Sequence, residues 1–246
     1  MTILLMTGTL NPAKGARELA RVNVADRIAD YKKALKHNLG LLDQGVIAGL
    51  AFVENSGYGM QDFENIVSAS GVGDRVDLMS YDARQSGEEP RFLGECKLLS
   101  HAFTRSDLIR NASDSHVWKI TGRYIVRNLA AILRDSEGNN DLILHCRNYP
   151  MRYVDFGLVG FRSFLAQSIV ARILGFGSLQ DTDERAVRDM IDNGVFADMK
   201  IRQRFSHVPD FEGVRGVDNS SFGGVRQRFR YHLRSIVHKI APRVWI

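Results

Sequence analysis

Cysteine and long apolar runs are both scarce in this chain of 246 residues. The two cysteines, Cys96 and Cys146, are too few for a disulfide framework, and neither has the CxxC or Cys/His spacing of a zinc site. The longest apolar runs, such as residues 46–53, fall far short of the roughly 20 residues that cross a bilayer. No basic stretch precedes the short apolar run at the N-terminus, so that run predicts a first strand and not a signal peptide. We therefore expect a cytoplasmic protein without a membrane-spanning helix.

Several catalytic fingerprints are missing as well. The chain has no GxxxxGK[ST] phosphate-binding loop and no G-x-G-x-x-G after its first predicted strand. It has no HExxH, and Ser163 lacks the second glycine of a nucleophile elbow. His145 and Cys146 are adjacent, but neighbouring residues of a strand point to opposite faces, which disfavours a Cys/His nucleophile. These absences argue against nucleoside triphosphatases, dinucleotide-dependent enzymes and the common hydrolases.

Acidic residues are absent from residues 219–246, which are rich in basic residues. The net charge of +5 therefore lies in this tail, and the rest of the chain is close to neutral. A neutral body with a basic tail favours a local electrostatic anchor over a protein whose whole surface follows a nucleic-acid backbone. We expect no nucleic-acid partner. The basic residues of the tail are Arg226, Arg228, Arg230, Arg234, Lys239 and Arg243.

The whole chain is 44% hydrophobic and 25% charged, which are the fractions of a soluble globular protein. Strand-like and helix-like segments alternate along the chain before the tail. Such alternation predicts an α/β fold with a mostly parallel sheet and helices on both faces. We expect one domain over residues 1–215 and a basic amphipathic tail over 216–246. The predicted strands include 2–6, 46–53, 75–81, 116–125, 141–145 and 153–159, and the predicted helices include 24–42, 61–70, 94–103, 127–134 and 161–174.

Polar residues follow the first three predicted strands. In an open parallel sheet the ligand crevice lies beyond the carboxyl ends of the strands, so these loops are the first places to search for a site. Their side chains can hydrogen-bond a base, a ribose or a sugar, although residues of these types are also ordinary turn formers. The three sets are Thr7, Thr9 and Asn11; Glu54, Asn55 and Ser56; and Asp82, Arg84 and Gln85.

Residues 119–124, with the sequence KITGRY, form the most informative short segment. On an extended chain the period of two places Lys119, Thr121 and Arg123 on one face, and Gly122 leaves room for a ligand beside the backbone. Two cations on one face can hold a diphosphate or a carboxylate. The alternative is a solvated sheet edge whose cations form ordinary salt bridges.

Four ordered segments together resemble a poorly described group of bacterial glycosyltransferases encoded with capsule or lipopolysaccharide O-antigen genes. They are LMTGTLNP at 5–12, FVENSGY at 52–58, Gly94-Glu95 within a helix, and KITGRY at 119–124. The resemblance extends over roughly the first two-thirds of the chain. The resemblance implies a Rossmann-like sheet of the GT-A type, which binds a nucleotide sugar at its carboxyl edge.

The same resemblance implies where the donor lies. It places the nucleotide in the loops after the first three strands, and the sugar diphosphate or the acceptor beside residues 119–124. The residues implied to bind the nucleotide sugar are Thr7, Gly8, Thr9, Asn11, Glu54, Asn55, Ser56, Asp82, Gly122 and Tyr124.

The chain departs from the common GT-A pattern where a metal-binding DXD motif normally follows the fourth strand. That place holds Lys119 and Arg123, so cationic side chains are expected to stabilise the leaving diphosphate, and no metal ligand is assigned. The one DXD sequence, at 181–183, has the features of a helix N-terminus. Asp155 and Glu95 are candidates for the base that activates the acceptor, and either is also compatible with a structural role.

The tail combines an apolar stripe with arginines. Apolar residues recur at helical spacing, and Trp245 lies near the end; the stripe consists of Val225, Phe229, Leu233, Ile236, Val237 and Ile240. This pattern is typical of a helix that lies on an anionic membrane surface, and it is also compatible with a helix docked on its own domain.

We therefore expect a glycosyltransferase that moves a sugar from a nucleotide sugar to a glycan or lipid-linked acceptor in bacterial surface polysaccharide synthesis. Its expected location is peripheral, at the inner face of the cytoplasmic membrane. The alternative is a non-catalytic scaffold whose basic helix binds a membrane or a partner protein. A divalent metal stays open as a cofactor.

Overall fold

The computed structural model describes residues 1–13, 19–83, 91–112, 114–136, 138–149, 151–176, 184–241 and 244–245. The predicted loop residues Arg84 and Gln85, and the DXD sequence at 181–183, lie outside the described residues.

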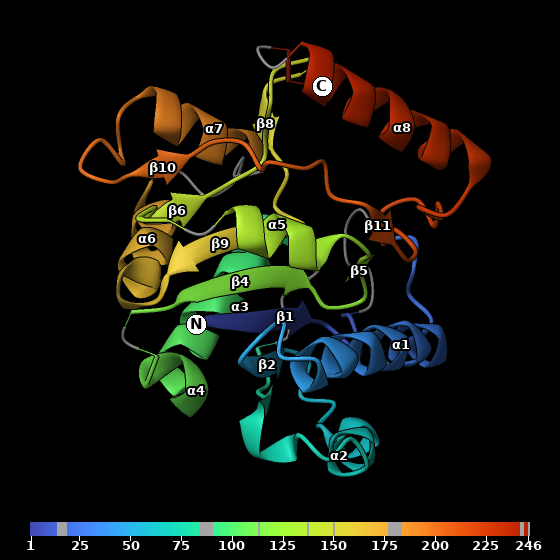
Figure 1. The fold of residues 1–246 in the computed structure, drawn as a ribbon. Coiled ribbons are helices and arrows are strands. Elements are labelled where there is room, and N and C mark those ends of the chain that lie inside the picture. The colour runs from blue at the N-terminus through green and yellow to red at the C-terminus, as the bar shows by residue number, and fades with distance from the viewer. Residues whose placement is uncertain are drawn as a thin grey trace.

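A central sheet organises the molecule (Figure 1). Within the described residues it has seven strands in the order β10-β6-β9-β4-β1-β2-β3. The pairs β1–β2, β1–β4, β2–β3 and β10–β6 are parallel, and β9 runs antiparallel to β4 and β6. The predicted mostly parallel α/β sheet is thus confirmed. The strands are β1 (Thr2–Gly8), β2 (Gly49–Glu54), β3 (Val76–Ser80), β4 (His116–Thr121), β6 (Leu142–Ile143), β9 (Leu158–Arg162) and β10 (Ile201–Arg202).

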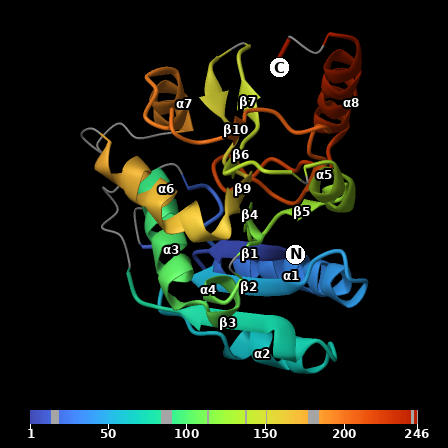
Figure 2. The ribbon, with the colours of Figure 1, turned by 60° about the vertical axis from the view of Figure 1, so that its left-hand side comes forward.

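Helices cover both faces of the sheet, as Figure 2 shows with α3 and α6 on one side and α1 and α5 on the other. The helix α1 begins at a capping residue, because the Asn23 side chain accepts a hydrogen bond from the backbone N–H of Asp26 at 3.1 Å. The helices are α1 (Val24–Asp43), α2 (Gln61–Ser68), α3 (Arg91–Arg105), α4 (Asp107–Arg110), α5 (Leu129–Asp135), α6 (Ser163–Gly175) and α7 (Glu184–Asp192).

The two faces of the sheet carry two hydrophobic cores. Alternate residues of β1 supply them, with Ile3 and Leu5 in the core under α3 and α6, and Leu4 and Met6 in the core under α1. A strand covered on both faces needs apolar residues at every position, which explains the continuous apolar runs of the sequence. All six residues of β2 are buried.

Short elements and a long helix complete the fold on the side of the sheet beyond β4 and β9. β5 (Ile125–Val126) pairs antiparallel with β11 (Phe211–Glu212), and β7 (Cys146–Arg147) pairs antiparallel with β8 (Tyr153–Val154). The helix α8 (Val225–Ile240) lies above β5 and β11 in Figure 1. In the part of the chain that the structure describes, no helix is both long and apolar enough to cross a membrane.

Two predicted strands differ from the structure. The run 116–125 ends as a strand at Thr121, because Tyr124 N–H donates to the Thr121 carbonyl at 2.8 Å and closes a turn. The run 153–159 is divided into β8 and β9, and Asp155 lies in the connection between them. Both breaks place polar residues at the end of the sheet instead of within it.

Candidate active site

The loops at the carboxyl ends of β1, β2 and β3 are joined to one another by hydrogen bonds. The Thr9 hydroxyl donates to Asn55 Oδ1 at 2.7 Å, and the backbone N–H of Asn11 donates to the Ser56 hydroxyl at 3.0 Å. Ser56 also forms an isolated antiparallel bridge with Asp82. Because parallel strands end at the same edge, residues far apart in the sequence meet here as the sequence predicts.

Glu54 organises these loops from beneath and is fully buried. Its Oε2 atom accepts from the Ser56 N–H at 2.7 Å and from the Ser56 hydroxyl at 2.6 Å, while Oε1 accepts from the Ser80 hydroxyl and from Gly59 N–H. Both carboxylate oxygens are thus engaged within the protein, and Glu54 shapes the loop without reaching its surface. Asp82 is exposed, and Thr9 and Asn11 are partly exposed.

The predicted open space beside Gly122 is filled. A side chain at Gly122 would lie 2.8 Å from the Thr7 carbonyl oxygen and 3.1 Å from the Tyr31 ring, and one at Gly8 would lie 2.9 Å from that ring. The expectation that Gly122 admits a ligand to the backbone is therefore wrong in this structure. The two glycines make room for Tyr31, whose hydroxyl accepts a hydrogen bond from the backbone N–H of Thr9 at 3.2 Å.

Lys119 lies inside the protein, with 1% of its side chain exposed. Its ammonium group contacts Glu95 Oε1 at 2.8 Å and donates to the Phe156 carbonyl at 2.5 Å. The same Glu95 oxygen accepts from the Thr7 hydroxyl at 2.5 Å. The solvated edge that the sequence left open for Lys119 is thus excluded, and Glu95 from α3 is tied to the ends of β1 and β4.

Arg123 does not share the strand face of Lys119, because β4 ends before it. Its guanidinium carbon lies 5.3 Å from the centre of the Tyr124 ring, and a side chain at Gly216 would come within 2.9 Å of that carbon. Arg123 is 8% exposed, and its buried Nε atom has no hydrogen-bond partner. Burial works to lower the pKa of Arg123, but the nearby Tyr31, Tyr124 and Glu95 outweigh it and raise that pKa above its ordinary value.

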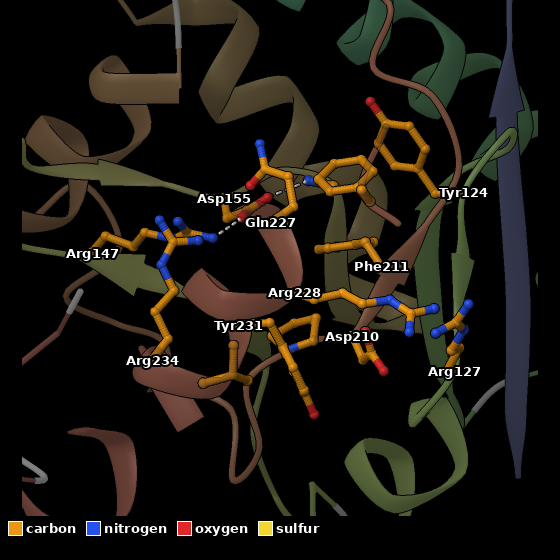
Figure 3. A pocket seen from close by; sticks show the side chains of 14 residues that line it. Tyr124, Arg127, Arg147, Asp155, Asp210, Phe211, Gln227, Arg228, Tyr231 and Arg234 are labelled. Carbon is orange, nitrogen blue, oxygen red and sulfur yellow. Dashed lines mark hydrogen bonds and ion pairs between the residues drawn. The ribbon is translucent and has the colours of Figure 1, made fainter. Parts of the chain in front are cut away.

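A cavity of about 90 Å³ lies under α8, next to the end of β4. Figure 3 shows Arg147 and Arg234 meeting beside Asp155, with Tyr124 and Phe211 on the opposite side. Aromatic rings form one wall, since the Tyr124 ring lies edge-on to the Phe222 ring at 5.1 Å. The lining residues are Tyr124, Arg127, Arg147, Asp155, Gly157, Val208, Pro209, Asp210, Phe211, Phe222, Gln227, Arg228, Tyr231 and Arg234.

Asp155 is the carboxylate of this pocket that the sequence singled out. Arg147 donates to its Oδ2 atom at 2.6 Å and the Gly157 N–H donates to its Oδ1 atom at 3.2 Å, while 21% of the Asp155 side chain stays exposed. Burial opposes ionisation, but Arg147, His145 and the Gly157 N–H outweigh it and lower the pKa of Asp155. Asp155 is therefore a carboxylate at neutral pH. Burial raises the pKa of the Cys146 thiol, which disfavours the thiolate that a nucleophile would need.

The residues at the end of β4 do not fit a divalent cation. Hard metal ions bind through oxygen atoms, but here the Glu95 carboxylate is already paired with the buried Lys119 ammonium, and the Arg123 guanidinium lies near it. Within the described ranges, no three residues among His, Cys, Asp and Glu gather in a way that could hold a metal ion.

Sequence reasoning missed several residues of this region. In the sequence, Tyr31 is one more apolar position of a predicted amphipathic helix. In the structure its ring fills the space beside Gly8 and Gly122. Arg147 and Arg234 lie far apart in the sequence and only the fold brings them together. Trp245 belongs to the body and not to the apolar stripe of the tail, because its carbonyl accepts from the Asn148 and Tyr149 N–H groups.

Protonation of His145 is expected to destabilise the fold. His145 is 3% exposed, and burial together with Arg147 lowers its pKa from 6.5 to about 3. As the pH falls between these two pKa values, His145 becomes protonated in the unfolded chain and stays neutral in the folded chain. The free energy of unfolding therefore decreases by about 1.4 kcal/mol per pH unit. Urea unfolding measured from pH 7 to pH 4 should show that the free energy of unfolding decreases less steeply with pH for His145→Gln than for the wild type. The exposed His232→Gln variant should follow the wild type, and equal slopes for all three proteins would contradict this role.

Comparisons with known proteins find no match to a family model, and no curated sequence matches the chain. Solved structures do align with it. A candidate nucleotide-diphospho-sugar transferase from Desulfovibrio desulfuricans G20 is 15% identical, with 97% of each chain covered and a TM-score of 0.49. An active-site variant of LgtC is 12% identical over 82% of this chain and 72% of that chain, with a TM-score of 0.48. HddC from Yersinia pseudotuberculosis is 12% identical, covers 94% of this chain and 96% of that chain, and has a TM-score of 0.42.

Proposed function

We propose that this protein is a glycosyltransferase that uses a nucleotide-sugar donor. One observation carries the proposal. The hydrogen-bonded loops after β1, β2 and β3, and the pocket that holds Asp155, lie at the same edge of the sheet on either side of the end of β4. A donor that spans this edge would have its nucleotide on the loops and its diphosphate beside residues 119–124, as the sequence resemblance implies. We place its sugar beside the pocket.

The donor side of the proposed site is formed by the exposed parts of the strand-end loops. Thr9, Asn11 and Asp82 offer hydroxyl, amide and carboxylate groups that can bind a base or a ribose. Glu54 and Ser56 hold these groups in place from below, so they act as positioning residues. Tyr31 and Arg27 fix the turn after β1, because the Arg27 Nε–H donates to the Thr9 carbonyl at 2.8 Å.

The leaving diphosphate needs positive charge as the glycosidic bond breaks, because negative charge grows on it in the transition state. We assign this role to Arg123, which is buried at the end of β4 and stays charged at any working pH. Lys119 is engaged with Glu95 and Phe156, so we assign it the role of holding Glu95 and the β4 end in place.

Asp155 is the carboxylate that we assign to the reacting sugar or the acceptor. Its lowered pKa makes it a weak general base at neutral pH, since proton transfer is most efficient when the pKa lies near the working pH. A permanent negative charge is instead suited to accept a hydrogen bond from an acceptor hydroxyl and to stabilise positive charge on the sugar ring.

A thermal-shift screen tests the donor proposal. A nucleoside diphosphate or its sugar at 100 times its dissociation constant should stabilise the fold by about 2.7 kcal/mol. Nucleoside monophosphates at the same concentration should stabilise it less, because they bind more weakly. Asn11→Ala should reduce the shift because it removes an amide from the proposed donor loop. Asn193→Ala, an exposed asparagine beyond α7, is the matched control. If no nucleotide shifts the melting temperature, the non-catalytic scaffold becomes the better description.

Membrane attachment is the second part of the proposal, and α8 supports it. None of its residues is buried, and Val225, Phe229 and Ile240 are 88%, 69% and 76% exposed. Arginines flank this apolar stripe without any acidic residue, which suits an anionic bilayer surface. A lipid-linked acceptor of surface polysaccharide synthesis would be reached at such a surface.

Point variants test the membrane proposal better than truncation, because the chain after residue 215 also packs on the body. The Gly216 carbonyl accepts from the Ala20 N–H at 2.8 Å, and Phe222 contacts Tyr124. These contacts join residues on both sides of the predicted domain boundary at 215/216, and the boundary stays a prediction. Phe229→Ser should weaken sedimentation with phosphatidylglycerol vesicles. The partly exposed Phe176→Ser, after α6, is the control, and equal sedimentation of all variants would contradict the proposal.

A further inference from the structure

We propose that the pocket beneath α8 is a binding site for a phosphate group, held mainly by Arg147 and Arg234. This inference rests on the proposed function for its biological meaning, because a glycosyltransferase has two phosphate-bearing substrates in reach. One is the diphosphate of the donor, and the other is the phosphate of a lipid-linked acceptor. The argument that the pocket binds an anion depends only on the residues that line it.

Positive charge exceeds negative charge in this pocket. Four arginines line it against two aspartates, Asp155 and Asp210. Arg127 is already paired with Glu212 at 2.8 Å outside the pocket, and Arg147 is paired with Asp155 at 2.6 Å. Within the described residues, Arg234 forms no ion pair or hydrogen bond. An anion is the ligand that such a surplus favours.

Arg147 and Arg234 point their guanidinium groups at each other, as Figure 3 shows. Arg147 is 7% exposed, and its buried Nε atom has no hydrogen-bond partner. Burial and the charge of Arg147 lower the pKa of Arg234, which is the signature of two cations held close together. A phosphate between them would remove this repulsion and accept paired hydrogen bonds from the planar guanidinium forks.

The shape of the pocket fits a phosphate with an attached ring or apolar group. The cavity of about 90 Å³ is several times what one water molecule requires. Opposite the arginines, the rings of Phe211 and Phe222 lie 5.5 Å apart, and both contact Tyr124. An aromatic wall of this kind packs against the face of a sugar or against a hydrocarbon chain.

The helix α8 joins this pocket to the exposed apolar stripe. Its residues Gln227, Arg228, Tyr231 and Arg234 line the pocket, and Val225, Phe229, Leu233, Ile236 and Ile240 are exposed on the rest of the helix. A helix that lies on a bilayer with the stripe would hold the pocket at the level of the lipid headgroups. This favours the lipid-linked phosphate as the source, and the experiment separates it from the donor.

Titration calorimetry with pyrophosphate, which carries the shared chemistry alone, tests the site. The wild type should bind it, Arg234→Gln should bind at least tenfold more weakly, and Arg226→Gln should bind as the wild type does, because Arg226 is exposed on α8 outside the pocket. Arg228→Gln supplies a second pocket variant should Arg234→Gln fold poorly. Absence of pyrophosphate binding to the wild type, or equal affinities of the pocket variants and Arg226→Gln, would overturn the proposal.

Two further ligands identify the source of the phosphate. If Arg234→Gln weakens binding of dodecyl phosphate below its micellar concentration but leaves the nucleoside diphosphates unchanged, the site serves a lipid-linked phosphate. If it weakens the nucleoside diphosphates instead, the site serves the donor. Failure of the proposed function is distinct, since the site would then bind pyrophosphate in a protein that transfers no sugar and shows no effect of Asn11→Ala.

Discussion

Arg123→Ala is expected to lower the turnover of sugar transfer by a hundredfold or more, with a smaller effect on donor affinity. By analogy with the removal of one oxyanion donor, the lost transition-state stabilisation should be about 3 kcal/mol. Arg123→Lys should recover part of this loss, because it keeps the charge and loses the planar fork. The measurement is kcat and KM for a nucleotide-sugar donor, per folded molecule.

A structural role for Arg123 would give a different result. The side chain is 8% exposed and packs beneath Gly216, so its removal also leaves a cavity. A purely structural arginine would lower the melting temperature and leave kcat per folded molecule unchanged. Both effects together are compatible with our assignment only when kcat falls more than the folded fraction does, which circular dichroism measures on the same samples.

Gly216→Ala displaces the guanidinium without removing it, and gives an independent check. The added methyl group would come within 2.9 Å of the guanidinium carbon of Arg123, so this side chain must move. The backbone tolerates alanine at Gly216, since its φ is outside the left-handed region. We expect kcat to fall in the same direction as for Arg123→Lys. Gly223→Ala, where the nearest atom is the Ser221 hydroxyl at 3.5 Å, should behave as the wild type.

The sheet could be predicted because its signals are local. Each parallel strand is buried on both faces and therefore appears as a continuous apolar run, and each ends in a polar turn. The rule that parallel strands end at one edge then places Thr9 beside Asn55 and Asn11 beside Ser56, although more than 40 residues separate the members of each pair.

The interior of the site could not be predicted because it depends on contacts between distant segments. The period of two fails after Thr121, since a turn ends β4 there, and Arg123 then packs against residues near 216 instead of beside Lys119. Glu54 reads as a polar loop residue, but the fold buries it and engages both its oxygens. The pocket under α8 needs residues from 124 to 234, which no local pattern connects.

Lys119→Met should be the most destabilising single change among those considered. The substitution preserves most of the side-chain volume but removes the charge, so it leaves Glu95 and the Phe156 carbonyl without their shared donor. Breaking a buried ion pair by removing one partner costs about 3–5 kcal/mol. Because 22% of the Glu95 side chain is exposed, water can replace part of the lost interaction, and we expect a decrease in the free energy of unfolding near the lower end.

A double-variant cycle separates the ion pair from packing. Glu95→Gln alone should destabilise the fold. The double variant should lose less free energy of unfolding than the sum of the two single losses, because Glu95→Gln removes the carboxylate charge that Lys119→Met leaves unpaired. Lys97→Met, an exposed lysine on the same helix as Glu95, should change the free energy of unfolding by less than about 1 kcal/mol. Urea unfolding at pH 7 gives all four values. Additive single changes would mean that Lys119 stabilises the end of β4 through the Phe156 carbonyl alone, and Glu95 would then need another reason for its place beside Thr7.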